Sequence, residues 1–246
     1  MKIRAFAERN LNELLRDIVA LLFAVGMPLL MILIWVIIAK AVPGDFMPAN
    51  FRPVNYIPAT ALFGMTFLSM FLGIHIAQDK ATSYLTRLFA GPMKTGEYLL
   101  GYALPVLPLC LVQMAVVFGC GLLIGYETTV AKLLATMGCL LISVPLFISM
   151  GMFLGCLLSE KAVSPLSSIL VQLMALTSGM MLDVDMIGGV YAGVCKALPF
   201  YHALNLAKVP AGACAVNPLI SVGVVVLYTV VFFMLSVVVF RKYQRQ

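Results

Sequence analysis

Six long stretches without a charged side chain constrain this chain more than any other feature of its sequence. Each is longer than the roughly 18 apolar residues that mark a membrane-spanning helix. Because a charged side chain is costly inside lipid, uncharged runs of this length are typical of spanning helices. We therefore predict an all-α integral membrane protein with six transmembrane helices. The predicted spans are residues 18–39, 56–78, 98–126, 133–159, 162–182 and 219–240.

The composition excludes a soluble globular enzyme and leaves no room for a second domain. Hydrophobic residues make up 63% of the 246 residues and charged residues only 11%, against about 25% charged residues in soluble domains. The segments between the spans are too short for a nucleotide-binding domain, and no phosphate-binding sequence of the form G-x-x-x-x-G-K-[ST] occurs. We predict a single transmembrane domain, residues 1–246, that is not an enzyme and takes any ATP-derived energy from another chain.

The basic residues predict the orientation, because Lys and Arg near the ends of spans are retained on the cytoplasmic side. With six spans both termini lie on one side, and that side receives 11 of the 16 Lys and Arg residues. Both termini are therefore predicted to be cytoplasmic. This asymmetry explains the formal net charge of +6, so nucleic acid is not needed as a partner.

Residues 2–17 are predicted to form an amphipathic helix on the membrane surface. Apolar residues such as Phe6 and Leu14 recur at helical spacing, and charged residues fill the other faces. A solvated cytoplasmic helix is the alternative, but an apolar stripe beside a bilayer favours the interface. The residues assigned to this helix are Arg4, Arg9, Leu11, Glu13 and Arg16.

Two segments between spans have patterns of their own. Residues 79–97 begin with about two turns of predicted helix, whose apolar side chains stop at Gly91 and Pro92. Residues 183–218 are apolar but interrupted by glycine and proline. Such breaks survive at membrane depth only where protein or a water-filled cavity covers them, so we predict short re-entrant helices in the outer leaflet between spans five and six.

His75 is the only histidine in a predicted span, and it precedes Asp79 by one turn. No metal site is predicted there, because His202 lies across the membrane and no carboxylate lies in mid-span. Cys195 and Cys214 share an outer loop and are a possible disulfide in an oxidising compartment.

Two pairs of glycines have the spacing that allows close approach of helices in lipid. We predict a packing role for both and no other function. The pairs are Gly121-x-x-x-Gly125 and Gly151-x-x-x-Gly155.

The order of three motifs resembles the permease subunits of ABC type-2 transporters over nearly the whole chain. The first is RNLNELLRD at residues 9–17, ahead of Pro28. The second is residues 79–93 followed by EYLLG at 97–101, and the third is Ser178-Gly179 with LP at 198–199 before the last span. The chain departs from the family at residues 80–83, where KATS replaces an Arg-Glu-Gly-Thr-like run.

This resemblance implies a mechanism that involves other chains. Two permeases, identical or homologous, pair around a pathway, and two P-loop ATPase subunits bind beneath them and hold ATP and Mg²⁺. This chain would hold no cofactor. It would export an amphipathic or hydrophobic substrate, such as a drug, peptide or lipid-like molecule, across the cytoplasmic membrane of a prokaryote. Residues 2–17 would be the connecting helix, and the coupling residues would be Asp79, Lys80, Thr82, Tyr84, Leu85, Arg87, Leu88 and Phe89.

The family places the pathway near spans two and five, and both have a mildly polar face here. Ordinary helix packing in lipid uses similar residues. The candidate pathway residues are Thr66, Ser69, Met70, Gly73, Ser168, Gln172, Ala175 and Gly179.

Two other functions stay open. An ion-coupled carrier or channel usually needs Asp, Glu, Lys or Arg side chains within its spans, and none of these occurs in the six. A non-transporting assembly subunit of a membrane complex is the second alternative. An ATPase that co-purifies with the chain would separate the permease from both.

Overall fold

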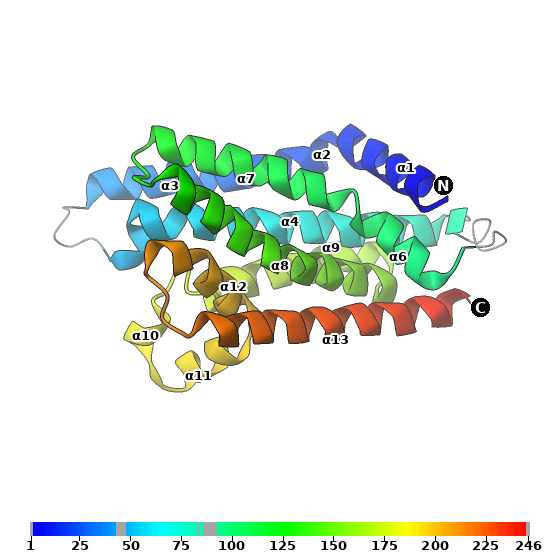
Figure 1. Cartoon of the computed structure of the whole chain (residues 1–246). Coiled ribbons are helices and arrows are strands. Elements are labelled where there is room, and N and C mark those ends of the chain that lie inside the picture. The colour runs from blue at the N-terminus through cyan, green and yellow to red at the C-terminus, as the bar shows by residue number, and fades with distance from the viewer. Residues whose placement is uncertain (1, 43–47, 83, 86–92, 245–246) are drawn as a thin grey trace.

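The protein is a bundle of helices (Figure 1). The computed structural model describes residues 2–42, 48–82, 84–85 and 93–244, and every regular element within these ranges is a helix, which confirms the predicted all-α class. The elements are α1 (Lys2–Arg16), α2 (Ile18–Leu21), η1 (Leu22–Gly26), α3 (Met27–Ala41), η3 (Ala49–Phe51), α4 (Pro53–Ala81), α6 (Thr95–Ala103), α7 (Val106–Leu123), α8 (Val130–Leu157), α9 (Glu160–Thr177), α10 (Val184–Ile187), α11 (Gly189–Ala197), α12 (Pro199–Lys208), η4 (Val209–Ala211) and α13 (Pro218–Gln244).

Both ends of the chain lie at one end of the bundle (Figure 1). We call this end the base; it holds α1, α6 and the C-terminal ends of α4 and α13. The short helices α10 and α11 lie toward the opposite end. An even number of crossings requires this placement of the termini.

Five helical stretches are long and apolar enough to cross a membrane, as a multi-pass membrane protein requires. The predicted fifth span corresponds to α9, which has 18 residues and begins with Glu160 and Lys161. It is not among the five stretches, so the sixth crossing stays a prediction. The five are Ile18–Ala41, Pro53–Ala81, Thr95–Leu123, Val130–Leu157 and Pro218–Gln244.

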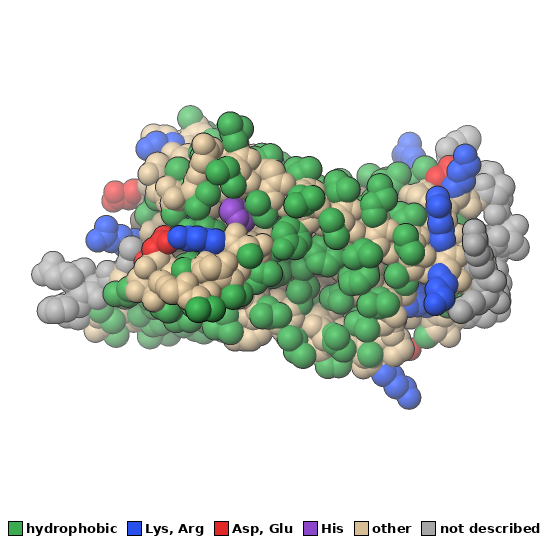
Figure 2. All heavy atoms as spheres, turned by 90° about the horizontal axis from the view of Figure 1, so that it is seen from below, with side chains coloured by type: hydrophobic (Ala, Val, Ile, Leu, Met, Phe, Trp, Pro, Cys, Tyr) green, Lys and Arg blue, Asp and Glu red, His purple; other side chains and the backbone are tan. Residues whose placement is uncertain are grey.

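The surface has the charge distribution that a bilayer demands. Figure 2 shows Lys, Arg, Asp and Glu gathered at the two ends, with hydrophobic side chains covering the length between them. Large exposed side chains such as Leu33, Leu111 and Leu227 belong to this apolar length. In water they would be an association hazard, but in lipid they are solvated.

Helix α4 forms the core of the bundle. Every side chain from residue 56 to residue 73 is buried, and the helix packs against α3, α7, α8, α9 and α12. A helix enclosed on all sides shows no amphipathic pattern. This explains why its sequence is apolar around the whole circumference.

Glycine lets α4 and α8 approach to backbone contact. A Cβ on Gly151 would overlap the carbonyl oxygen of Ser69, and one on Gly155 would lie 2.5 Å from the carbonyl oxygen of Gly73. The predicted packing role of Gly151-x-x-x-Gly155 is thereby confirmed.

In the other glycine pair, Gly121 and Gly125, only the first residue contributes to helix packing. A Cβ on Gly121 would lie 2.9 Å from the side chain of Ile57 on α4, so this residue packs as predicted. Gly125 lies beyond the end of α7 with a φ of 98°. It serves the turn rather than a helix contact.

Prolines account for the irregular parts of two predicted spans. The first span contains a π-helical turn, Leu22–Gly26, just before Pro28. Pro28 has no N–H and crowds the preceding turn, so the hydrogen-bond register shifts there. The third span is not one continuous helix from residue 98; it begins at Thr95 and is divided at Leu104 and Pro105 into α6 and α7.

Short helices do form between residues 183 and 218, as predicted, and the longest, α12, is buried against α4, α8 and α13. Asn205 of α12 fixes the loop that precedes α13. Its Oδ1 accepts from the backbone N–H groups of Ala215 (2.8 Å) and Val216 (3.2 Å), and its Nδ2 donates to Ser221 Oγ at 3.0 Å. Re-entry of this segment into the outer leaflet stays a prediction.

The disulfide that the sequence left open is not formed, because both Cys195 and Cys214 are free thiols. Cys195 is fully buried in a small cluster with Val184 and Tyr201, whereas Cys214 is exposed in the loop before α13. The packing of α11 therefore uses the thiol of Cys195 as a small apolar group.

Replacing Gly151 with Ala should destabilise the protein by about 1–3 kcal/mol, because the added methyl group would have to displace the α4 backbone. The matched control is Gly138→Ala in the same helix, where a Cβ meets no atom within 4 Å. Thermal unfolding of both variants in the same detergent measures the difference. Equal midpoints would contradict the backbone contact between α4 and α8.

Candidate functional site

One face of α1 fixes this helix to α6. The ring of Phe6 packs edge-on against Tyr98 and Tyr102, with centroid distances of 5.9 and 5.0 Å. Next to it, Asn10 Nδ2 donates to the carbonyl oxygen of Gly101 at 3.0 Å. Only glycine fits at position 101, because a Cβ there would overlap the Phe6 ring. These contacts set the position of α1 relative to the end of α4.

An ion pair joins α1 to the last turn of α4. Arg9 Nη1 donates to Asp79 Oδ2 at 2.9 Å, and Arg9 Nη2 donates to Asp79 Oδ1 at 3.1 Å. The hydroxyl of Tyr102 on α6 donates to Asp79 Oδ2 at 2.6 Å. Two-point contact between a guanidinium and a carboxylate fixes both distance and orientation. The buried carboxylate of Asp79 thus connects three elements.

Arg9 has two further contacts. Its Nη2 lies 2.7 Å from Glu13 Oε1, and its guanidinium lies 3.9 Å from the centre of the Tyr84 ring, a cation–π contact. Burial by itself would lower the pKa of Arg9, but the hydrogen bond to Asp79 and the charges of Asp79 and Glu13 outweigh it and raise the pKa. Burial also raises the pKa of Tyr84. Arg9 therefore keeps its positive charge.

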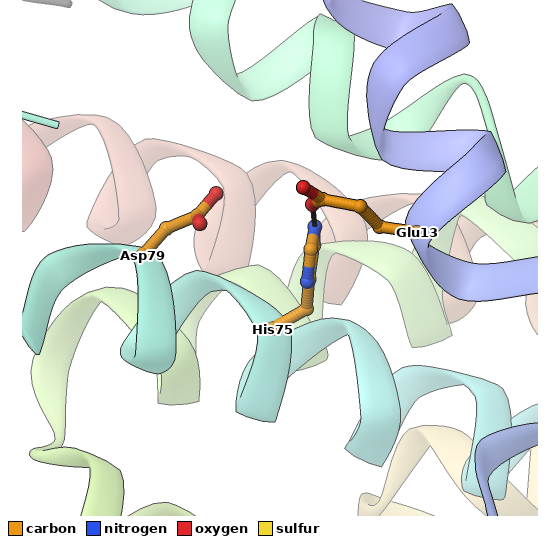
Figure 3. Close-up of side chains that lie close together, drawn as sticks. All are labelled: Glu13, His75 and Asp79. Carbon is orange, nitrogen blue, oxygen red and sulfur yellow. Dashed lines mark ion pairs between the residues drawn. The ribbon is translucent and has the colours of Figure 1, made fainter. Parts of the chain in front are cut away.

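Three potential metal ligands do meet here, which the sequence argument against a metal overlooked. Ligand atoms of Glu13, His75 and Asp79 lie within 4.8 Å of one another, and His75 Nε2 lies 3.2 Å from Glu13 Oε2 (Figure 3). The reasoning failed because Glu13 comes from α1 rather than from a span. However, Arg9 pairs with both carboxylates, and a divalent cation would be repelled by it. The residues do not fit a resident metal ion.

Lys80, the residue after Asp79, connects α4 to two other helices. Its Nζ donates to the carbonyl oxygens of Gly155 (3.0 Å), Cys156 (2.5 Å) and Leu158 (2.9 Å). These are the free carbonyl groups at the C-terminus of α8, where a cation is favourable. The hydroxyl of Tyr243 on α13 donates to the Lys80 carbonyl oxygen at 2.9 Å. The base therefore joins α1, α4, α6, α8 and α13 through two adjacent residues.

The predicted coupling residues divide into four groups. Asp79, Lys80 and Tyr84 take part in the contacts above, and Thr82 is exposed at the end of α4. Leu85 was predicted to contact the ATPase as a coupling residue, but it is fully buried in the core. That assignment is corrected, because the packing of the segment turns this side chain inward. Arg87, Leu88 and Phe89 lie outside the described residues.

The residues assigned to the connecting helix lie on a real helix, α1, with a buried face and a charged face. Arg4 pairs with Glu8 at the surface, at 2.8 Å, and Arg16 is exposed. Leu11 is half-buried beside Leu104 at the groove between α1 and α7. The position of α1 on a membrane surface stays a prediction.

The candidate pathway residues are not one surface in the folded chain. On α4, Ser69 donates to the Phe147 carbonyl oxygen on α8, and Gly73 is used for packing. Thr66 bonds to its own helix. On α9, Ser168 and Gln172 are exposed, whereas Ala175 and Gly179 are buried. A 4.0 Å contact from Ser168 Oγ to Met70 Sδ joins the two sets.

Two residues of the base were missed from sequence. Tyr102 follows the EYLLG motif directly, and that proximity is a signal that was available. Asn10 lies inside the RNLNELLRD motif, as the polar member of an otherwise apolar face with Phe6 and Leu14. A buried polar position on an amphipathic helix indicates a specific partner.

A family model described as ABC-2 type transporter matches residues 1–209, which include α1 to α12 and every residue of the base except those on α13. No curated protein matches the chain.

Replacing Arg9 with Ala should cost roughly 2–3 kcal/mol, toward the low end for a broken buried pair, because the Asp79 carboxylate would stay buried without its cation. The side chain of Arg9 is 29% exposed, so water screens part of the loss. Chemical unfolding in detergent measures the change. Arg4→Ala is the control, because its exposed pair with Glu8 should contribute nothing measurable.

The double variant Arg9→Ala with Asp79→Asn tests the cause. It removes the charge that Arg9→Ala leaves unpaired, so it should recover part of the lost stability. If Arg9→Ala is as mild as Arg4→Ala, the ion pair does not hold α1 in place.

Proposed function

The chain belongs to the ABC-2 type transporter family, and from this premise we propose that it is the permease subunit of an ATP-driven exporter. Membership makes it a multi-pass membrane protein and a transport subunit. The proposed location is the cytoplasmic membrane of a prokaryote, with both termini in the cytoplasm. ATP and Mg²⁺ would be bound by a separate P-loop ATPase, present in two copies, and this chain would hold no cofactor.

The contacts of Asp79 carry this proposal. Asp79 begins the predicted coupling segment, residues 79–97, and it is bonded at once to Arg9 of α1 and Tyr102 of α6. Lys80 bonds to the end of α8. Packed helices joined in this way move as rigid bodies. A partner that displaces the segment when it binds ATP would therefore move several helices together.

We expect the ATPase to dock on the part of the coupling segment that follows Leu85. Leu85 is buried, so it is not available to a partner. The remaining apolar pair in the sequence is Leu88 and Phe89, next to Arg87. Aromatic and arginine side chains are enriched at protein interfaces, which favours an ATPase groove over lipid as their partner.

A second permease, identical or homologous, is proposed to cover the outer face of α9. Ser164, Ser168 and Gln172 follow one another at four-residue spacing and are all exposed. Small hydroxyl and amide side chains are poorly placed against lipid but commonly join helices. The transport pathway would run along this face, where Met70 of α4 reaches Ser168.

The proposed substrate is amphipathic or hydrophobic: a drug, a peptide or a lipid-like molecule. The face of α9 offers hydroxyl and amide groups and the neighbouring Met70 a thioether, with no fixed charge among them. An ion-coupled carrier or channel is less well supported, because charged side chains gather at the ends of the molecule (Figure 2). A non-transporting assembly subunit does not fit a family of transport subunits.

We propose that α9 is the sixth crossing. Its 18 residues extend about 27 Å, close to the roughly 30 Å of a hydrocarbon core. It begins after Leu158, which bonds to Lys80 at the base. It ends at Thr177, and the next residue, Ser178, lines a cavity together with residues at the start of α4.

The native thiol of Cys214, which is exposed in the loop before α13, should react with a membrane-impermeant maleimide added to intact cells. The base should be protected, so Thr82→Cys in a Cys214→Ser background should react only after the cells are opened. Mass-tag gel shifts measure both. Labelling of position 82 in intact cells with no labelling of Cys214 would reverse the topology.

Tagged protein purified gently from its native membranes should retain a P-loop ATPase, whereas the stripped chain should hydrolyse no ATP above background. Replacing Leu88 with Asp should abolish the retention, because a charge buried at an interface without a partner is costly. Immunoprecipitation followed by ATPase assay and protein identification measures this.

The matched control is Val130→Asp, an exposed apolar residue at the first position of α8, at the opposite end. An acidic residue is favourable there, and the ATPase should be retained. If Leu88→Asp retains as much ATPase as the wild type, this segment is not the docking site. If the stripped chain hydrolyses ATP, the subunit assignment fails.

A further inference from the structure

A cavity of about 260 Å³ lies at the end of the bundle opposite the base. It is bounded by the end of α9, the start of α4, α12 and the loop that precedes α13. A water molecule occupies about 30 Å³ of liquid, and pockets for drug-sized ligands begin at about 300 Å³. The cavity therefore has room for a compact polar group rather than for a large substrate. None of the residues assigned to ATPase coupling lines it.

Opposite charges line this cavity without neutralising each other. Asp183, Asp185 and Lys208 all contribute to its wall. Asp185 pairs outward with Lys196, at 2.7 Å, and Lys208 forms no ion pair with any residue that the structure describes. Burial lowers the pKa of Lys208, and the charges of Asp183 and Asp185 oppose that change. The ammonium of Lys208 is thus partly desolvated without a direct partner.

Tyr201, on the wall of the same cavity, has an unused polar group. Its side chain is 6% exposed, and its buried hydroxyl has no hydrogen-bond partner among the described residues. Asp185 and Asp183 lie near enough for their charges to raise its pKa further, although burial is the main cause. An orphaned buried hydroxyl is unusual in a folded protein. It becomes understandable where a ligand supplies the missing partner.

The hydrogen bonds of Asn205 show that the wall of the cavity is preformed. Both its carbonyl oxygen and its amide nitrogen are already bonded to the loop before α13 and to Ser221. It is therefore structural, and it holds Ala215, also on the wall, in place. A preformed cavity binds a ligand without the entropy cost of ordering its own loop.

The charges disfavour simple ions. An inorganic anion at Lys208 would be repelled by Asp183 and Asp185, and a simple cation at the carboxylates would be repelled by Lys208. We propose that the cavity binds a compact zwitterion, with its oxyanion at Lys208 and its primary ammonium at the carboxylates of Asp183 and Asp185. The closest match in chemistry is a phosphoethanolamine group.

Two features select this headgroup among zwitterions. A quaternary ammonium such as choline is held by several aromatic faces, and among the residues that the structure describes Tyr201 is the only aromatic one on this wall. A primary ammonium instead donates hydrogen bonds, which carboxylates accept. Lysine is a common point-charge binder of phosphate. The group comes either from a phosphatidylethanolamine lipid at the membrane surface or from a small soluble molecule.

Isothermal titration of the purified full-length chain tests this proposal directly. Phosphoethanolamine should bind, whereas inorganic phosphate, ethanolamine and phosphocholine should bind at least about tenfold more weakly, as expected when one charge-assisted contact is lost. Native mass spectrometry from nanodiscs, with phosphatidylethanolamine, phosphatidylcholine or phosphatidylglycerol, then identifies the source. Retained phosphatidylethanolamine indicates a lipid, and binding of the soluble group alone indicates a solute.

Lys208→Gln should weaken phosphoethanolamine binding by about tenfold or more. The matched control, Lys132→Gln, removes an exposed lysine at the start of α8, at the same end of the bundle, and should bind as the wild type does. Tyr201→Phe is the second variant. It should weaken binding without lowering the unfolding temperature, because in the free protein this hydroxyl has no partner to lose.

Three results would overturn the proposal. The first is a wild-type chain that binds neither phosphoethanolamine nor phosphatidylethanolamine. The second is equal binding of inorganic phosphate or of ethanolamine alone, which would make this a simple ion site. The third is unchanged binding by Lys208→Gln and Tyr201→Phe. These assays need no ATPase, so their failure would leave the permease assignment untouched.

Discussion

The enclosure of α4 is the constraint on which the rest of the structure depends. In its most apolar stretch 83% of the residues are buried, against 11% in α13, so α4 meets protein where other spans meet lipid. Its neighbours must therefore match its surface closely. The backbone contact through Gly73, Gly151 and Gly155 is one consequence. Another is that its buried ion pair, between Asp79 and Arg9, lies in its last turn rather than in its middle.

The base shows how a carboxylate is accommodated at the end of such a helix. Asp79 is buried, but one cation and one hydroxyl satisfy it, and each comes from a different element. Buried ion pairs contribute little net stability when compared with apolar packing, but they specify geometry. The pair with Arg9 therefore serves mainly to fix α1 against α4 and α6. That fixed geometry is what a coupling mechanism requires, because a loose contact would absorb the movement of a partner.

The base and the proposed zwitterion cavity lie at opposite ends of the same helix. Asn55, in the first turn of α4, lines the cavity, and Asp79, in its last turn, forms the base. The 29 residues of α4 extend about 43 Å. A rigid displacement of this helix moves both ends together. A ligand in the cavity would also contact both the end of α9 and α12, which line the same wall.

The sequence by itself determined the helical class, the amphipathic pattern of residues 2–17, most of the apolar spans and the role of Gly151 and Gly155 in helix packing. These features depend on local composition and spacing, which a single chain displays directly. Only the tertiary structure decided which side chains meet. Arg9 and Asp79 are 70 residues apart, and Tyr102 is 23 residues beyond Asp79, so no periodicity connects them. The burial of Leu85 and the separation of Cys195 from Cys214 likewise follow from the direction in which packing turns each side chain, and that direction is a property of the whole bundle.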